Sequence, residues 1–235
     1  MTTQAKTRAL SWLEQRAVLH MGMIEALRRG DAKLLCAEDG GVLLFERKSG
    51  AYMLSAGSPE AGERLLEAVG PAGLFVAHQD FMVPILTQRF GLNNKFDCRQ
   101  AVYLGGEALP ACDNTAISVL RRRHEGTVLD HYRTTDDAPY IRNRIAGRQM
   151  FGAFVNGNLA GFIGVHSEGS MGFLEVLPEY RRMGLGAALE SYLVNLHLQK
   201  GWTPFCQIFA DNEPSLRLQR KLGLEVSEEH MYWLF

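Results

Sequence analysis

The segment from Phe173 to Gly186, which reads FLEVLPEYRRMGLG, places two arginines and two glycines where a strand is expected to turn into a helix. The turn itself is Pro178–Tyr180, and Arg181–Gly186 forms the entry to the helix that follows. The first backbone amides of a helix have no partner within the helix, and the helix dipole adds partial positive charge there. Gly184 and Gly186 would let a pyrophosphate approach the backbone. This segment therefore predicts an anion-binding turn.

Two common phosphate-binding classes do not fit this turn. A Walker loop would need Gly-Lys-Ser or Gly-Lys-Thr, which does not follow here. A dinucleotide fingerprint would need a third glycine at the position of Leu189, and an early βαβ context is also missing. The turn alone indicates only that an anion fits at a helix start.

Arg181, Gly184 and Gly186 match the acyl-CoA signature Arg/Gln-x-x-Gly-x-Gly/Ala of the GCN5-related N-acetyltransferases, the GNAT superfamily, which the chain therefore resembles. The preceding strand and its Pro-x-Tyr turn match as well. Within the superfamily, the LPEYR turn and the α/β first half look similar to the FR47-like, glycine N-acyltransferase-like branch.

A second family element, Asn-x-x-Ser/Ala-x-x-Leu-Tyr-x-x-x-Gly-Phe, lies further along the chain. It is matched by Asn212, Ser215, Leu218 and Gly223, whereas Leu224 stands at the aromatic position. The resemblance covers residues 113–235 and implies the GNAT fold for that half.

The resemblance also implies a co-substrate, acetyl-CoA or another short acyl-CoA, and a small-molecule or amino-acid primary amine as its acceptor. Backbone groups at the end of the strand would pair with the pantetheine arm. The residues implied in cofactor binding are Val176, Leu177, Arg181, Arg182, Met183, Gly184, Leu185, Gly186, Ala187, Asn212 and Ser215.

Direct attack of an amine on the thioester needs a base, because an ordinary amine is mostly protonated at neutral pH. Three candidates lie on the expected meander: His166, Glu168 and Glu175. We assign Glu175 and Glu168 as catalytic and expect His166 to be a surface residue. The alternatives stay open: Glu168 in a solvated turn, and Glu175 simply alternating between the faces of its strand.

Gln219 is the clearest departure from the family, which usually has a tyrosine there to protonate the leaving thiolate. Glutamine cannot donate an acidic proton, and Tyr232 and Cys206 are speculative replacements. A second hypothesis is therefore a non-catalytic CoA-binding or CoA-sensing protein with a decayed active site. A third is a protein acetyltransferase, which would need an open groove.

The expected fold class is α/β with a mixed sheet, in two domains, residues 1–112 and 113–235. The boundary follows the turn-rich segment 105–114. The first domain repeats the order of strands and helices of the second without any residue-level repeat. Whether it is a degenerate GNAT-like half or an unrelated α/β domain stays open.

Hydrophobic periodicity and turn residues give the expected elements. Helices are expected at residues 8–29, 58–69, 81–90, 126–132, 136–146, 185–200 and 214–222. Strands are expected at 41–47, 51–55, 73–77, 98–104, 117–120, 150–155, 159–166, 171–177 and 203–209, with a final strand pair in 225–235. The Asn156-Gly157 dipeptide predicts a tight hairpin.

Composition excludes several classes of function. A formal net charge of −1 gives no general attraction to nucleic acid or membranes, so the run Arg121–His124 is interpreted as a solvated face. Four scattered cysteines and seven histidines show no metal-ligand spacing, so we expect no metal. The N-terminus lacks an apolar signal core, which favours a cytoplasmic protein. A homodimer stays open.

Overall fold

The structure, a computed structural model, describes residues 3–110, 115–134 and 137–235. The chain forms two compact units. Unit 1 comprises Met1–Val102, Gln207–Gln219 and Leu224–Phe235, and unit 2 comprises Tyr103–Cys206 and Arg220–Gly223.

The predicted domain boundary between residues 112 and 113 lies outside the described residues. The division of the sequence into domains 1–112 and 113–235 therefore stays a prediction. In the structure, two segments from the last thirty residues pack in the same compact unit as residues 1–102.

Unit 1 contains a meander followed by alternating helices and strands. Its helices are α1 (Thr3–Leu13), α2 (Ala17–Arg28), α3 (Pro59–Leu66) and α4 (Met82–Phe90). Its strands are β1 (Ala32–Glu38), β2 (Gly41–Glu46), β3 (Tyr52–Ala56), β4 (Phe75–Ala77), β5 (Lys95–Val102), β11 (Glu225–Val226) and β12 (Met231–Leu234).

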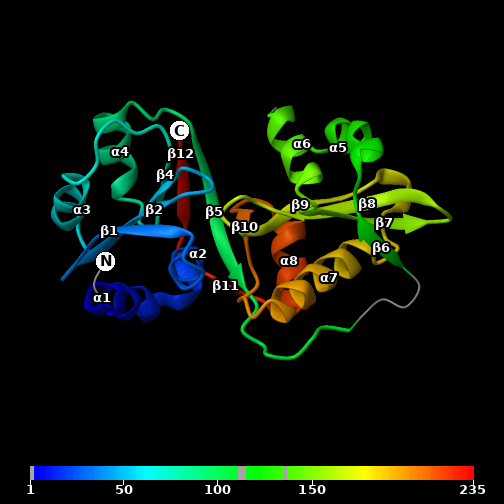
Figure 1. The fold of residues 1–235 in the computed structure, drawn as a ribbon, viewed down its shortest axis with the longest axis horizontal. Coiled ribbons are helices and arrows are strands. Elements are labelled where there is room, and N and C mark those ends of the chain that lie inside the picture. The colour runs from blue at the N-terminus through cyan, green and yellow to red at the C-terminus, as the bar shows by residue number, and fades with distance from the viewer. Residues whose placement is uncertain (1–2, 111–114, 135–136) are drawn as a thin grey trace. The chain divides into compact units, whose positions relative to one another are not determined.

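The sheet of unit 1 joins the start of the chain to its last strand. Strands β1, β2 and β3 run antiparallel, and β4 is parallel to β3. β12 is antiparallel to both β4 and β5, and Figure 1 shows it in red between them. The core beneath includes Leu43, Leu54, Phe75 and Leu234, all fully buried.

Two strands form in residues 225–235, as predicted, but they pair with β5 and not with each other. β11 and β12 both pair with β5, through Glu225 opposite Val102 and Met231 opposite Cys98. The amide of Ser227, between the two strands, donates to the carbonyl of Gln100 at 2.8 Å. The chain therefore continues along β5 instead of reversing on itself.

The helix predicted at residues 8–29 is interrupted by a 3-10 turn, Glu14–Arg16, because Arg16 leaves the helical region with φ −136° and ψ 61°. The imidazole of His20 bonds the carbonyl of Leu13 at this break, at 3.0 Å. β1 was not predicted, since only its first residue is buried and the strand shows no alternation.

Unit 2 is built on an antiparallel meander with helices on both faces. Its strands are β6 (Ala116–Val119), β7 (Met150–Val155), β8 (Asn158–Val165), β9 (Met171–Val176) and the start of β10 (Phe205–Phe209). Its helical segments are η2 (Arg122–His124), α5 (Glu125–His131), α6 (Ala138–Ala146), η3 (Pro178–Tyr180) and α7 (Leu185–Gln199). A last helix, α8 (Glu213–Lys221), lies mostly in unit 1.

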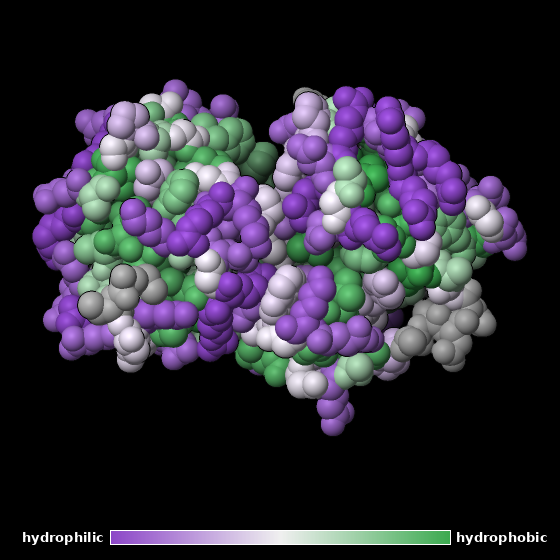
Figure 2. All heavy atoms as spheres, in the orientation of Figure 1, coloured by the Kyte–Doolittle hydropathy of each residue, from purple (hydrophilic) through white to green (hydrophobic). Residues whose placement is uncertain are grey.

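The meander of unit 2 separates two helical layers. In Figure 1, α5 and α6 lie above the strands and α7 lies below them. Val128, Ile141 and Ile145 from α5 and α6 pack against Phe162 and Phe173 of the sheet. Figure 2 shows mainly hydrophilic residues on the outward surface of α5 and α6. The helices α5 and α6 are thus amphipathic, and their apolar sides cover one face of this sheet.

The predicted Asn-Gly hairpin between β7 and β8 is confirmed, with φ 50° at Asn156 and 82° at Gly157, as a type I′ turn requires. The two halves also share one order of elements. Each has two helices, a three-strand meander, a helix, a strand parallel to the last meander strand, and another helix.

Candidate active site

The predicted anion-binding turn connects β9 to α7 through η3. Arg182 has φ 63° and Gly184, which caps α7, has φ 80°, so two residues adopt the left-handed conformation. A Cβ on Gly184 would have no atom within 4 Å, which leaves open space at the helix start. The amides of Leu185 and Gly186 lie in the first helical turn, where no intrahelical acceptor exists. This geometry fits the pyrophosphate of an acyl-CoA.

Arg181 does not project freely from this turn. Its guanidinium donates to the carboxylate of Glu175 and to the carbonyl of Val176, each at 3.2 Å. Both acceptors lie at the end of β9. Arg181, the first residue of the motif, therefore fixes the turn to the strand that precedes it.

β9 combines a bulge with an incompletely paired edge. Its register with β8 shifts between Phe162 and Gly164, opposite Phe173, which has φ 58°. A bulky residue with positive φ is a strained outlier of the kind that occurs at functional sites. Among the described residues, the parallel ladder to β10 is limited to Met171 and Cys206. The following backbone groups of β9 are thus suited to pair with an extended ligand such as a pantetheine arm.

Phe173 is the centre of an aromatic cluster on this face of the sheet. Its ring centroid lies 4.1 Å from that of His166, 5.0 Å from that of Tyr132 and 5.8 Å from that of Tyr140. The imidazole of His166 and the ring of Tyr140 are nearly parallel, at 11°. The imidazole fits here because residue 172 is a glycine, since a Cβ at that position would be 2.3 Å from Nε2 of His166.

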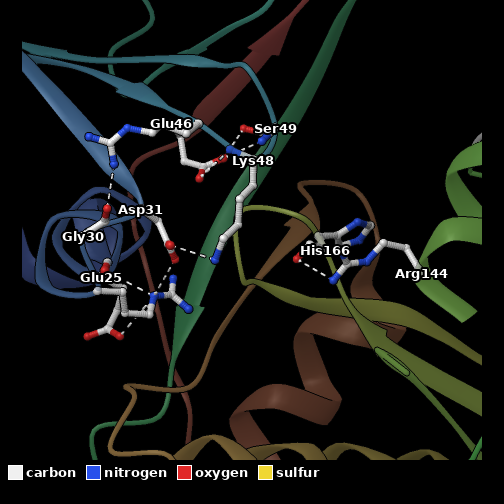
Figure 3. A network of polar contacts seen from close by, with 10 residues as sticks. Glu25, Gly30, Asp31, Glu46, Lys48, Ser49, Arg144 and His166 are labelled. Carbon is white, nitrogen blue, oxygen red and sulfur yellow. Dashed lines mark hydrogen bonds and ion pairs between the residues drawn. The ribbon is translucent and has the colours of Figure 1, made fainter. Parts of the chain in front are cut away.

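Hydrogen bonds fix the same residues. The hydroxyl of Tyr140 is 3.0 Å from Nδ1 of His166, and the amide of Ser167 donates to the Tyr140 oxygen at 3.2 Å. Arg144, also on α6, donates to the carbonyl of Val165. It also donates to the carbonyl of His166, as Figure 3 shows. The prediction that His166 is a surface residue is therefore wrong, because stacking on Phe173 half-buries its ring.

Glu168 is not in a solvated turn. Its side chain is buried and accepts a short hydrogen bond from the hydroxyl of Ser170. Glu175 remains partly exposed beside Arg181. The two carboxylates assigned as catalytic thus differ in environment, one enclosed and one ion-paired near the surface. Their catalytic role stays a prediction.

Burial controls the protonation of the aromatic cluster. It lowers the pKa of His166, an effect that Glu168 opposes and Arg144 reinforces. Burial raises the pKa of Tyr132 to about 12 and also raises the pKa of Tyr140. At neutral pH the cluster therefore holds a neutral imidazole and two protonated phenols.

The second predicted motif lies in α8. The Asn212 side chain accepts from the amide of Ser215 at 3.2 Å, so it caps this helix. Gln219 is buried, and its Oε1 has no hydrogen-bond partner among the described residues. These residues belong to unit 1, whereas Arg181–Ala187 belong to unit 2. A joint role in binding one acyl-CoA stays a prediction.

The corresponding turn of the N-terminal half, between β3 and α3, is built differently. Ser58 accepts from the amide of Ala61 at 3.2 Å and so caps α3. Glu60 follows in the first turn, and a hydrogen bond from Ser58 lowers its pKa. A side-chain cap and a carboxylate occupy the place where an anion would bind. The start of α3 therefore does not repeat the phosphate-binding turn proposed before α7.

Sequence reasoning missed Tyr132 and Tyr140. Both lie in or beside the short helices α5 and α6, where no motif marks them. Within the described residues, no group of three His, Cys, Asp or Glu side chains is arranged to hold a metal ion, and no helix is long and apolar enough to span a membrane.

Residues 152–234 match the family model described as FR47-like protein. A comparison with curated proteins finds no match. The matched segment contains the whole of both motifs. The predicted membership in the GNAT superfamily, in its FR47-like branch, is thereby confirmed for this region.

Solved structures resemble the whole chain. A Drosophila protein is 17% identical, with a TM-score of 0.67, and the match covers 99% of this chain and 88% of that one. A GCN5-related N-acetyltransferase-like protein from Streptococcus suis is 16% identical, with a TM-score of 0.54 and coverages of 94% and 96%. A GNAT-family acetyltransferase from Colwellia psychrerythraea is 14% identical, with a TM-score of 0.53 and coverages of 96% and 97%. At such identities the likeness concerns the fold, and it confirms the predicted α/β GNAT class.

Proposed function

We propose, from the premise that the matched region belongs to the FR47-like branch of the GNAT superfamily, that the protein is an acyl-CoA-dependent N-acyltransferase. It would transfer an acetyl or short acyl group to a primary amine of a small molecule or amino acid. The observation that carries this proposal is the turn Arg181–Gly186, where Gly184 at φ 80° opens the first turn of α7 directly after β9.

The proposed binding mode follows from the elements around this turn. The pyrophosphate of acetyl-CoA would accept from the first amides of α7. The pantetheine arm would extend along β9 near Val176 and Leu177, as an added strand. An amide of β9 would then hold the thioester oxygen, whose negative charge grows during attack. Asn212 and Ser215 are proposed to complete the binding set.

The aromatic cluster packs around Phe173 of β9 and therefore lies beside the proposed thioester position. Tyr132, Tyr140 and Phe173 offer ring faces, and Glu168 and Glu175 supply negative charge. Ring faces and carboxylates together favour a cationic amine in its approach to the site. Glu175 and Glu168 are the proposed proton acceptors within reach of that amine.

A second candidate function is CoA binding without catalysis. The observation that favours it is Gln219, a buried amide at the position where the family usually has tyrosine. The two functions share the same cofactor site and differ in turnover alone.

Release of free thiol from acetyl-CoA, measured with a panel of primary amines, tests the proposal. CoA titration by calorimetry runs in parallel. Binding with turnover of at least one amine supports the enzyme. Binding without turnover of any amine supports the non-catalytic alternative, and absence of binding contradicts both.

A further inference from the structure

We propose that Tyr140 and His166 form a proton relay for the acyl transfer, an inference that rests on the proposed function. The Tyr140 oxygen takes a proton from the attacking amine while its own proton passes to Nδ1 of His166. The same path in reverse delivers a proton to the leaving thiolate.

The direction of the hydrogen bonds defines the relay. The amide of Ser167 can only donate, so the Tyr140 oxygen is the acceptor in that contact, at 3.2 Å. The relay assigns the hydroxyl proton of Tyr140 to the hydrogen bond with Nδ1 of His166, whose two atoms are 3.0 Å apart. Nδ1 accepts, which assigns the imidazole proton to Nε2. The second lone pair of the Tyr140 oxygen remains for an N–H of the substrate.

The imidazole is fixed on the strand assigned to the thioester. It is stacked on Phe173, with ring centroids 4.1 Å apart. It also lies over the backbone of Gly172, where any Cβ would be 2.5 Å or less from two of its atoms, Nε2 and Cδ2. The bulge that gives Phe173 its positive φ therefore also sets the position of His166.

The surrounding charges let the imidazole take up a proton and release it again. Glu168, from the turn between β8 and β9, favours the imidazolium, and Arg144, from α6, opposes it. Arg144 itself is bound to the carbonyls of Val165 and His166. Tyr140 faces the ring from α6, and Glu175 lies further along β9.

The atoms and electrons balance without another reactant. Glu175 or Glu168 first takes the extra proton of the cationic amine and releases it to solvent. The neutral amine then forms a C–N bond at the thioester carbonyl, and one of its N–H protons moves to the Tyr140 oxygen as the phenol proton moves to His166. The C–S bond breaks, and the sulfur leaves with the electron pair. The imidazolium then returns its proton through Tyr140 to the sulfur. The products are an amide and a thiol, with both side chains restored. The relay supplies the acid that Gln219 cannot provide.

Tyr140→Phe is the decisive variant, because it removes the hydroxyl and keeps the ring that stacks beside His166. His166→Gln removes the other member, and Tyr192→Phe, on α7, is the matched control. We measure kcat, KM for acetyl-CoA and the pH dependence of kcat. In both relay variants, kcat should fall by about 100-fold, and the acidic limb of the kcat–pH profile should disappear. KM for acetyl-CoA should stay unchanged in these variants, and all three quantities should stay unchanged in Tyr192→Phe.

A Tyr140→Phe enzyme with wild-type kcat and pH profile overturns the relay while the proposed function stands. A wild-type protein that binds CoA but acylates no amine overturns both. Nitrogen NMR of His166 gives a readout apart from turnover: Nδ1 should carry no proton in the wild type, and its resonance should move in Tyr140→Phe. A protonated Nδ1 in the wild type at neutral pH also overturns the relay.

Discussion

The guanidinium of Arg181 lies 3.2 Å from the carboxylate of Glu175, so the first residue of the acyl-CoA motif is ion-paired with the last acidic residue of β9. The same guanidinium holds the carbonyl of Val176. One side chain thus couples the proposed phosphate-binding turn to the strand proposed to carry the thioester. Protonation of Glu175 would break this ion pair. Glu168 differs, because its enclosed side chain accepts a hydrogen bond from Ser170 instead.

Arg181→Gln should weaken CoA binding by about tenfold, the effect of losing one charged hydrogen bond near the anion. The pair with Glu175 is exposed, so the free energy of unfolding should change by less than about 1 kcal/mol. Calorimetric titration with CoA and urea unfolding measure the two quantities. Arg64→Gln, on the exposed surface of α3, controls for the loss of a positive charge. Equal CoA affinity in both variants would show that Arg181 takes no part in binding.

Glu168→Gln should shift the titration of His166 to lower pH. The carboxylate of Glu168 raises the pKa of His166, so its removal leaves the lowering effects of burial and Arg144 unopposed. NMR titration of the imidazole measures this shift, and the acidic limb of the kcat profile should move in the same direction. If the limb disappears instead, Glu168 itself is the titrating base. Glu175→Gln, assayed beside it, tests the other assigned carboxylate.

Gly184→Ala should destabilise the turn although no atom blocks the added methyl group. Its φ of 80° is left-handed, which costs an alanine about 1 kcal/mol. Relief of that strain would move the first amides of α7, so CoA affinity should fall as well. Gly106→Ala is the control, since this glycine has open space around it and no positive φ. Equal stability and equal CoA affinity in the two variants would contradict the conformational argument.

Acid should destabilise unit 1 through two buried histidines. Burial lowers the pKa of His20 to about 4 and that of His78 to about 3, and their rings are 5.2 Å apart. The unfolded chain takes up protons below its ordinary histidine pKa, about 6.5, whereas the folded chain does not. The free energy of unfolding should therefore be intact above pH 6.5 and fall by roughly 1.4 kcal/mol per pH unit for each histidine below it.

Urea unfolding between pH 7 and pH 5 measures this slope in the wild type and in His78→Gln. The variant should show a shallower pH dependence, whatever its absolute stability. Identical slopes in the two proteins would mean that His78 does not contribute to acid sensitivity.

Features that depend on neighbours along the chain could be predicted from the amino-acid sequence. The Arg181–Gly186 motif, the Asn156-Gly157 hairpin and the Ser58 cap each need only a few adjacent residues in one backbone conformation. Local sequence encodes such conformations directly. The GNAT fold class and the family therefore followed from the sequence before any distance was known.

Which distant side chains come into contact depends on long-range packing and became visible in the folded structure. Tyr140 and His166 are 26 residues apart, and their contact depends on how α6 packs over the sheet and on the bulge at Phe173. The enclosure of Glu168 and the pairing of β12 with β4 have the same origin. Long-range packing leaves no short-range pattern in the chain, because it minimises exposed apolar surface over the whole unit. The turn Arg181–Gly186 was thus predictable from the sequence, whereas the side-chain contacts beside it required the fold.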